Sequence, residues 1–258
     1  MSGPQPKKSL GQHFLVDDNI LGVIARLAEL GPADVVLEIG PGLGALTRLL
    51  AEQCAHVHAV ELDHRLEPHL RDVAAAPNVT LHWGDALRLD LAGFDPAPTK
   101  LVANLPYNIA TPIVAESLDG LPGIERWCVM VQREVADRFF AVPSTKAYGA
   151  VSVLIQLATT RTGFHPVARS VFRPPPNVDS ALVAFRRTAL PPDFAGLRKV
   201  VEGAFAHRRK TLANSLQLAG VTTREHAVAA LVELGLDPAV RAEALAPPVF
   251  LELARLVR

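Results

Sequence analysis

The stretch Val35-Val36-Leu37-Glu38-Ile39-Gly40-Pro41-Gly42-Leu43-Gly44 decides the fold of this chain. Its first five residues form a mostly apolar run, which predicts a buried strand, and residues 45–53 follow with the pattern of a helix. The glycines between them let the backbone approach a ligand and open the N-terminus of the helix toward it. We therefore expect a strand, a nucleotide-binding loop and a helix, with Gly40 and Gly42 in contact with the ligand.

Two kinds of nucleotide ligand fit this loop. The spacing Gly40-x-Gly42-x-x-Ala45 matches the dinucleotide fingerprint, and Glu61 ends the next predicted strand, at residues 56–61, where a ribose-binding acid belongs. NAD and S-adenosylmethionine both contain a ribose, so Glu61 does not distinguish them. The compact E-x-G-x-G-x-G form that begins at Glu38 is typical of methyltransferases and favours the methyl donor.

The alternation of strands and helices continues along the chain, which predicts a Rossmann-like α/β fold. Leu190-Pro191-Pro192 marks a boundary, and the remainder is helical. Strand patterns occur at residues 79–83, 100–103 and 127–131, helical patterns at 65–75, from about 111, at 132–139 and at 148–157, and a late strand pair at 159–165 and 181–187.

Polar residues follow two of the predicted strands. Asp85 comes after residues 79–83, and Asn104 comes after residues 100–103. Open α/β sheets bind their ligands at the carboxyl ends of the strands. Asp85 can accept a hydrogen bond from the amine of a bound adenine, or it can simply cap a helix.

The turn Asn104-Leu105-Pro106-Tyr107-Asn108 suits methylation of the exocyclic amine of adenine. That nitrogen is a poor nucleophile because its lone pair is delocalised into the ring. The Asn104 side-chain oxygen and the Leu105 carbonyl can each accept one N–H, which frees the lone pair. Tyr107 can stack on a base that has left its helix. The alternative is a structural turn with a capping Asn and a packing Tyr.

Three further segments carry candidate binding residues. Residues 7–15 precede a helix and are either a ligand-gripping arm or a surface leader. The loop 169–180 is stiffened by three consecutive prolines, and its Phe172 can cover the far side of an inserted base. Residues 205–214 form a short basic cluster, which suits phosphates or is a solvated helix face. The residues expected to contact RNA are Arg169, Arg173, Arg208, Arg209 and Lys210.

Composition excludes several classes of protein. The chain is 49% hydrophobic, which indicates a folded protein, and no apolar run reaches membrane-spanning length. Cys54 and Cys128 lie in apolar segments without metal-ligand spacing, so we expect buried free thiols and a cytoplasmic protein. His56 and His58 share a strand face but lack a third ligand, so no metal is expected. Because the formal net charge is zero, the case for RNA rests on particular residues.

Seven motifs, between about Lys8 and Asn214, closely resemble those of the KsgA-type ribosomal RNA adenine dimethyltransferases, whose relatives include the macrolide-resistance (Erm) RNA methyltransferases. The chain departs from this family in its overall neutrality, since the family is usually basic. The motifs are K-x-x-G-Q-H-F-L, E-I-G-P-G-x-G, V-E-L-D, G-D-A, N-L-P-Y-N, V-F-x-P-P-P-x-V-D-S-A and R-R-K-T-L-x-N.

The resemblance implies a fold and a site. The fold is a seven-stranded, mostly parallel sheet of the class I methyltransferase type over residues 1–189, with an arm at 1–16, followed by a small all-helical RNA-recognition domain at 190–258. Asn104, Leu105 and Tyr107 would orient and stack the target adenine, with Phe172 as a second stacking surface. S-adenosylmethionine would be bound by His13, Leu15, Gly40, Glu61, Asp85 and Asn104, with Gly42 of the glycine loop beside them.

The resemblance also implies a reaction, which is N6,N6-dimethylation of two adjacent adenosines near the 3′ end of small-subunit (16S) ribosomal RNA. The enzyme would act as a monomer on a partly assembled 30S-type subunit. Three alternatives stay open. The first is an Erm-type enzyme acting on 23S ribosomal RNA, although Arg169–Ala181 and Arg208–Asn214 fit the KsgA pattern better. The others are an assembly factor with incidental catalysis and a nicotinamide oxidoreductase, which would leave Asn104–Asn108 without a role.

Overall fold

The structure, a computed structural model, describes residues 12–257. Lys7 and Lys8 of the predicted arm lie outside the described residues. No helix in the described part of the chain combines the length and apolar character needed to cross a membrane. The chain divides into two compact units, one made of the chain up to Ala136 together with Thr160–Arg187, the other of Asp137–Thr159 together with Thr188–Arg258.

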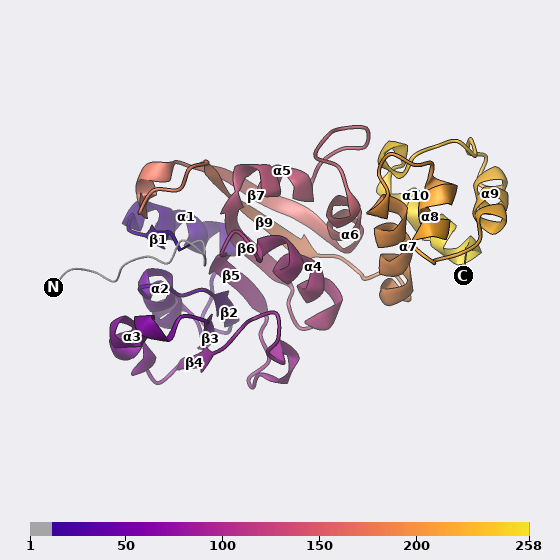
Figure 1. Cartoon of the computed structure of the whole chain (residues 1–258). Coiled ribbons are helices and arrows are strands. Elements are labelled where there is room, and N and C mark those ends of the chain that lie inside the picture. Colours follow the sequence, from indigo (N-terminus) through magenta and orange to yellow (C-terminus); the bar gives the residue numbers. More distant parts are fainter. Residues whose placement is uncertain (1–11, 258) are drawn as a thin grey trace. The chain divides into compact units, whose positions relative to one another are not determined.

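A seven-stranded sheet forms the centre of the first unit (Figure 1). Its order is β4-β3-β2-β5-β6-β9-β7, in which neighbours from β4 to β6 are parallel and β9 runs antiparallel to β6. This confirms the predicted Rossmann-like, mostly parallel sheet. The strands are β2 (Val35–Ile39), β3 (His56–Glu61), β4 (Val79–Trp83), β5 (Lys100–Asn104), β6 (Arg126–Gln132), β7 (Thr159–Val167) and β9 (Ser180–Arg187).

Helices cover both faces of this sheet because the side chains of its strands alternate between the faces. On β6, Cys128 and Met130 are buried in a cluster with Ile24 of α1. Trp127 points to the opposite face, where its Nε1–H donates to Ser117 Oγ of α4 at 2.8 Å. Figure 1 shows α1 and α4 on opposite sides of the sheet. The helices of the first half are α1 (Asp18–Ala28), α2 (Ala45–Gln53), α3 (Glu67–Ala74), α4 (Ala110–Gly120) and α5 (Arg133–Phe139).

A short two-stranded sheet joins the arm to the proline-rich loop. Strand β1 (Phe14–Leu15) pairs antiparallel with β8 (Phe172–Arg173), with Leu15 opposite Phe172. The Val16 N–H extends this ladder by donating to the Val171 carbonyl at 2.9 Å. The described end of the arm is therefore fixed by backbone hydrogen bonds rather than by side chains alone.

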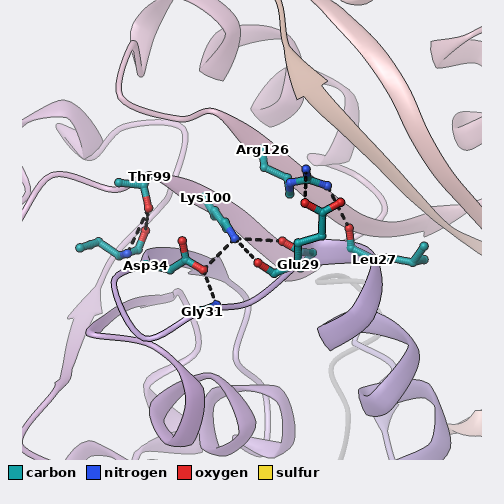
Figure 2. Close-up of polar contacts among 9 residues, drawn as sticks. Leu27, Glu29, Gly31, Asp34, Thr99, Lys100 and Arg126 are labelled. Carbon is teal, nitrogen blue, oxygen red and sulfur yellow. Dashed lines mark hydrogen bonds and ion pairs between the residues drawn. The ribbon is translucent and has the colours of Figure 1, made fainter.

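A charged cluster at the amino edge of the sheet holds the end of α1 (Figure 2). We call Glu29, Asp34, Lys100 and Arg126 the α1 anchor. Lys100 Nζ lies 2.7 Å from Asp34 Oδ2, and it donates to the carbonyls of Ala28 and Glu29. Arg126 Nη2 lies 2.6 Å from Glu29 Oε2. Cations at a helix C-terminus interact favourably with the helix dipole and with its last carbonyls, so the anchor fastens α1 to the first residues of β5 and β6.

The second unit is helical and has its own buried polar contacts. The Tyr148 hydroxyl donates to the Leu245 carbonyl at 2.8 Å, and Ser215 Oγ donates to the Gly203 carbonyl at 2.7 Å. A Cβ on Gly203 would lie 2.5 Å from Val221 Cγ2, so only glycine permits this close approach. The helices are α6 (Ala150–Ala158), α7 (Phe194–Ala206), α8 (Leu212–Leu218), α9 (Arg224–Glu233) and α10 (Pro247–Leu256).

The unit boundary lies near the predicted one at residue 189, but residues 137–159 belong to the second unit. The reason is that α6 packs on α7 and α10, so a segment placed before the late strands joins the C-terminal helices. The division of the chain at 189/190 and the RNA-recognition role of residues 190–258 stay predictions.

Candidate functional site

A cavity opens at the carboxyl edge of the sheet, beyond the ends of β2, β3 and β5. It is bordered by the glycine loop, by the segments after β3 and β4, by the turn after β5 and by the described part of the arm. This is the edge at which open α/β sheets bind ligands. The cavity brings together all the residues predicted to hold the cofactor and three of those predicted to act on the base, namely His13, Leu15, Gly40, Gly42, Glu61, Asp85, Asn104, Leu105 and Tyr107.

The glycine loop adopts a backbone that only glycine accepts easily. Gly40 and Gly42 have φ values of 78° and 60°, in the left-handed region. A Cβ on Gly40 would lie 3.2 Å from Pro106 Cδ, and one on Gly42 would lie 3.0 Å from Phe14 Cδ1. The loop therefore packs between the arm and the turn after β5, and larger residues would clash with Phe14 or Pro106.

Glu61 ends β3 with its carboxylate held by the backbone. Its two oxygens accept from the Gly42 N–H at 3.3 Å and from the Asp63 N–H at 2.8 Å. Burial raises the pKa of Glu61, and these N–H groups oppose that rise because they stabilise the ionised form. A buried carboxylate fixed in this way beside a glycine loop fits the hydroxyl groups of a ribose.

Asn104 has its carboxamide orientation set by the arm. Its Nδ2 donates to the His13 carbonyl at 3.1 Å. A carbonyl can only accept, so this bond assigns the nitrogen to the arm and leaves Oδ1 as an acceptor for another group. The adjacent peptide is also fixed, because the Leu105 N–H donates to the Met130 carbonyl at 3.1 Å. Asn104 and Leu105, the two residues predicted to accept hydrogen bonds from an adenine amine, therefore line one cavity on a turn that is tied to β6.

Tyr107 is held at its hydroxyl and at its ring. The hydroxyl lies 2.6 Å from Ser180 Oγ, and the ring centroid lies 5.6 Å from that of His13. Burial raises the pKa of Tyr107, with the Ser180 bond opposing that rise. Because the hydroxyl is already held, the ring can stack on a planar ligand with little further loss of side-chain entropy.

Comparison with known proteins shows the family of this chain. The family model described as "Ribosomal RNA adenine dimethylase" matches residues 3–257. The chain belongs to the ribosomal RNA adenine dimethylase family. It is 49% identical to the ribosomal RNA small subunit methyltransferase A of Rubrobacter xylanophilus over 98% of this chain and 96% of the relative.

Two solved structures resemble this family member. A dimethyladenosine transferase from Plasmodium falciparum superposes with a TM-score of 0.76 at 24% identity, covering 93% of this chain and 96% of its own, which supports the fold. The 23S rRNA methyltransferase ErmE superposes with a TM-score of 0.67 at 30% identity, covering 95% of this chain and 99% of its own. The class I methyltransferase fold predicted for this chain is thereby confirmed.

The structure contradicts the stacking role predicted for Phe172. Its side chain is fully buried in the core cluster that contains Leu15 and Met130, and it does not line the cavity. Side chains alternate along a strand, and in the two-residue strand β8 it is Arg173 that faces outward. Phe172 therefore packs the joint between arm and loop, and no base can reach it in this conformation.

Sequence reasoning gave no contact to Ser180 and used Glu38 only as part of the donor motif, yet the structure places both at or beside the site. Ser180, part of the quoted V-F-x-P-P-P-x-V-D-S-A motif, fixes Tyr107 but carried no polar pattern of its own. Glu38 lines the cavity from the interior of β2 and is 1% exposed. The sequence did contain a signal for Glu38, because a carboxylate within an apolar strand is rarely buried unless it has a partner or a function.

The arginines of the proline-rich loop differ in how they are held. Arg169 Nε lies 3.0 Å from Asp179 Oδ1, and its Nη1 donates to the Asn177 carbonyl at 3.2 Å, so Arg169 braces the loop. Arg173 is exposed, and its Nη1 donates to the Phe172 carbonyl at 3.4 Å. Their contact with RNA stays a prediction.

The basic cluster of the second unit also contains one arginine held by protein contacts and two exposed cations. Arg208 Nη2 donates to the Tyr148 carbonyl at 3.1 Å and lies 3.4 Å from Glu243 Oε2, so Arg208 ties the cluster to the helical core. Arg209 and Lys210 are exposed, and phosphate binding by these two residues stays a prediction.

The histidines of β3 are occupied by neighbours. His58 Nε2 lies 2.8 Å from the Pro96 carbonyl, which makes it a donor, so Nδ1 accepts from His82 Nε2 at 3.1 Å. His56 Nε2 lies 3.0 Å from Thr80 Oγ1. Within residues 12–257, no three metal-ligating side chains gather into a group that could hold a metal ion.

Proposed function

We propose that this family member transfers methyl groups from S-adenosylmethionine to N6 of two adjacent adenosines near the 3′ end of small-subunit ribosomal RNA, giving N6,N6-dimethyladenosine. The observation that carries the proposal is the position of Asn104. Its oxygen is left as an acceptor on the wall of the same cavity that contains the glycine loop and Glu61. A methyl-donor site and an amine-gripping site therefore share one space.

The residues of the cavity fit the donor. The cavity lined by Gly40 and Gly42 suits a nucleoside, and Glu61 suits its ribose. Asp85 caps a turn, since its Oδ1 accepts from the Leu87 N–H at 3.0 Å, and it also lines the cavity, where it would accept from the amine of the donor's adenine. When bound, S-adenosylmethionine supplies an electrophilic methyl group on a sulfonium.

The protein contributes positioning and the exclusion of water. Asn104 Oδ1 and the Leu105 carbonyl each accept one N–H of the target amine, which moves the nitrogen toward tetrahedral geometry and frees its lone pair. Tyr107 holds the plane of the base. The attacked amine becomes acidic and loses its proton without a strong base. After the first transfer one N–H remains, so the second transfer proceeds with one such hydrogen bond.

The proposed substrate is an unstacked pair of adenosines displayed by a partly assembled 30S-type subunit, since sequence-specific RNA recognition targets single-stranded loops and junctions. The enzyme acts as a monomer in the cytoplasm, where such subunits are assembled. Arg173, Arg209 and Lys210 are the exposed cations proposed to contact phosphates.

The test is incubation with isotopically labelled methyl donor and immature small subunits, then mass spectrometry of the digested RNA. We expect N6,N6-dimethyladenosine in small-subunit RNA and no label in large-subunit RNA. Absence of the dimethylated nucleoside from small-subunit RNA, or label only in large-subunit RNA, would contradict the proposal. The Asn104→Ala variant separates catalysis from an assembly role. If methylation is lost and subunits still mature normally, methylation is the function of the protein; if maturation also fails, an assembly role is favoured.

A further inference from the structure

His13 lies at the point where three parts of the base site meet. The residue precedes β1, is half-buried and lines the cavity. Its backbone carbonyl accepts from Asn104 Nδ2 at 3.1 Å, and the centroid of its ring lies 5.6 Å from that of Tyr107. Its Nδ1 lies 2.8 Å from the carbonyl oxygen of Pro174 in the proline-rich loop. One residue therefore contacts the turn after β5, the ring of Tyr107 and the loop.

The Pro174 carbonyl fixes the imidazole of His13. A carbonyl can only accept a hydrogen bond, so the proton of the neutral ring is on Nδ1, which donates to it. The bond also continues the ladder between β1 and β8, because Pro174 follows Arg173, the residue paired with Phe14. His13 is therefore held on one side by the adjoining backbone ladder and on the other by the hydrogen bond of its own side chain.

The fixed imidazole supports Tyr107 at its ring. A centroid separation of 5.6 Å with the planes tilted by 30° is typical of two rings in direct contact, so no base fits between them. His13 is therefore not a replacement for Phe172 as a second stacking surface. It is instead the neighbour that limits the movement of the Tyr107 ring, whose hydroxyl is held separately by Ser180 Oγ at 2.6 Å.

We propose that His13 is a positioning residue for methyl transfer, whose side chain keeps Tyr107 and Asn104 aligned by donating from Nδ1 to the Pro174 carbonyl. This inference rests on the proposed function, because it takes an adenosine as the group that Tyr107 and Asn104 hold. It differs from the donor contact that the family resemblance implies for His13, since it assigns the side chain to the target base. Without the bond, the imidazole is free to rotate away from Tyr107, and the His13 carbonyl is free to shift against Asn104. The amine is then less often in position for attack.

The second methyl transfer is the step more sensitive to this alignment. The target amine then keeps one N–H, so it makes one hydrogen bond where it made two to Asn104 and Leu105, and its position depends more on Tyr107. A loosened base site therefore slows the second transfer more than the first, and N6-monomethyladenosine accumulates. Partial unfolding only reduces the amount of active enzyme, so it slows both transfers equally.

The experiment separates the two contacts of the side chain with three variants of the full chain. His13→Asn keeps an N–H donor near the position of Nδ1 but has no ring, His13→Phe keeps a ring but has no donor, and His13→Ala has neither. Methyl transfer is followed in single turnovers on immature small subunits at saturating labelled donor, with mass spectrometry of the monomethylated and dimethylated nucleosides. Affinity for S-adenosylhomocysteine is measured by calorimetry, and His69→Ala, at an exposed position of α3, is the control that should behave as the wild type.

We expect His13→Ala and His13→Phe to slow methyl transfer about tenfold and to accumulate the monomethylated nucleoside, because one hydrogen bond is lost. His13→Asn should stay within about threefold of the wild type, and affinity for S-adenosylhomocysteine should be unchanged in all three variants. Wild-type transfer in His13→Ala, a His13→Asn variant no faster than His13→Phe, or a loss of affinity equal to the loss of transfer would overturn the proposal. If His13→Ala fails to fold, the comparison of His13→Asn with His13→Phe decides. Absence of N6,N6-dimethyladenosine with the wild type would instead contradict the proposed function.

Discussion

The two edges of the central sheet use similar side chains in opposite ways. At the amino edge, the α1 anchor pairs every charge, with Lys100 against Asp34 and Arg126 against Glu29. At the carboxyl edge, Glu38 Oε2 is buried without a hydrogen-bond partner among the described residues. The amino edge is complete within the protein, whereas the carboxyl edge requires a ligand to complete it.

This difference separates residues that stabilise the fold from residues kept for chemistry. A buried polar atom without a partner costs free energy, so a fold retains one where a bound ligand repays that cost. Substitutions at the amino edge should therefore change the free energy of unfolding, and substitutions at the carboxyl edge should change methyl transfer. Each of the following variants tests one side of this comparison.

The largest effect is expected for Asn104→Ala. Removing a preorganised acceptor of the target amine should lower methyl transfer about 10³-fold, while the loss of one bond to His13 lowers stability by about 1 kcal/mol. Single-turnover transfer of labelled methyl groups and urea unfolding measure the two quantities. Asn19→Ala, at an exposed position of α1, is the control that should change neither. A tenfold or smaller loss of transfer would show that the carboxamide does not hold the amine.

The opposite result is expected for Lys100→Met at the amino edge. The substitution leaves Asp34 without its cation and the last carbonyls of α1 without their donor, so the free energy of unfolding should fall by about 3 kcal/mol. Turnover below the unfolding transition should stay unchanged. Urea unfolding and steady-state kinetics measure this, with the exposed Lys199→Met as control. A large fall in turnover of the folded enzyme would mean that the two edges are not independent.

A pH-dependent effect is expected for Glu38→Gln. Burial raises the pKa of Glu38 from 4.5 to about 8, so between these values the unfolded chain has lost a proton that the folded protein keeps. Stability of the free wild type therefore falls as pH rises through this range, and Glu38 contributes to the fall. Melting temperatures measured from pH 5 to pH 9 should show a shallower decline for Glu38→Gln. If the melting temperatures of the wild type and of Glu38→Gln change with pH in parallel, the raised pKa of Glu38 is contradicted.

The smallest effect is expected for the bond between Tyr107 and Ser180. Tyr107→Phe and Ser180→Ala should each lower turnover about fivefold, because each removes one hydrogen bond worth about 1 kcal/mol. The double variant should lose no more than either single one, since the same bond is removed. Kinetics at saturating donor measure this, donor affinity should be unchanged, and Ser180→Thr should restore turnover. Additive losses would show that the two hydroxyls act separately.

Much of the sheet could be predicted because buried parallel strands are continuous apolar runs bounded by glycine and proline. The strand at 35–39 has the same limits in the sequence pattern and in the structure. The pairing of β1 with β8 could not be predicted, because two residues give no periodicity and the partners lie far apart in the chain. The burial of Phe172 was missed for the same reason, since a two-residue strand does not show which side chain faces inward.

The site was predictable where it depends on the ends of parallel strands, which meet at one edge of a sheet. Glu61, Asp85 and Asn104 each follow or end such a strand, and all three line one cavity. The unused oxygen of Glu38 and the bond between Tyr107 and Ser180 depend on contacts between distant segments. Such contacts follow from tertiary packing and leave no local pattern in the sequence.

The backbone pairing of Leu15 with Phe172 has a practical consequence for handling the protein. Gln12–Leu15 form part of the cavity wall, so a shortened expression clone that starts after Val16 would breach that wall even if the rest of the sheet folded. Assays on different preparations are therefore comparable only when this end of the chain is the same.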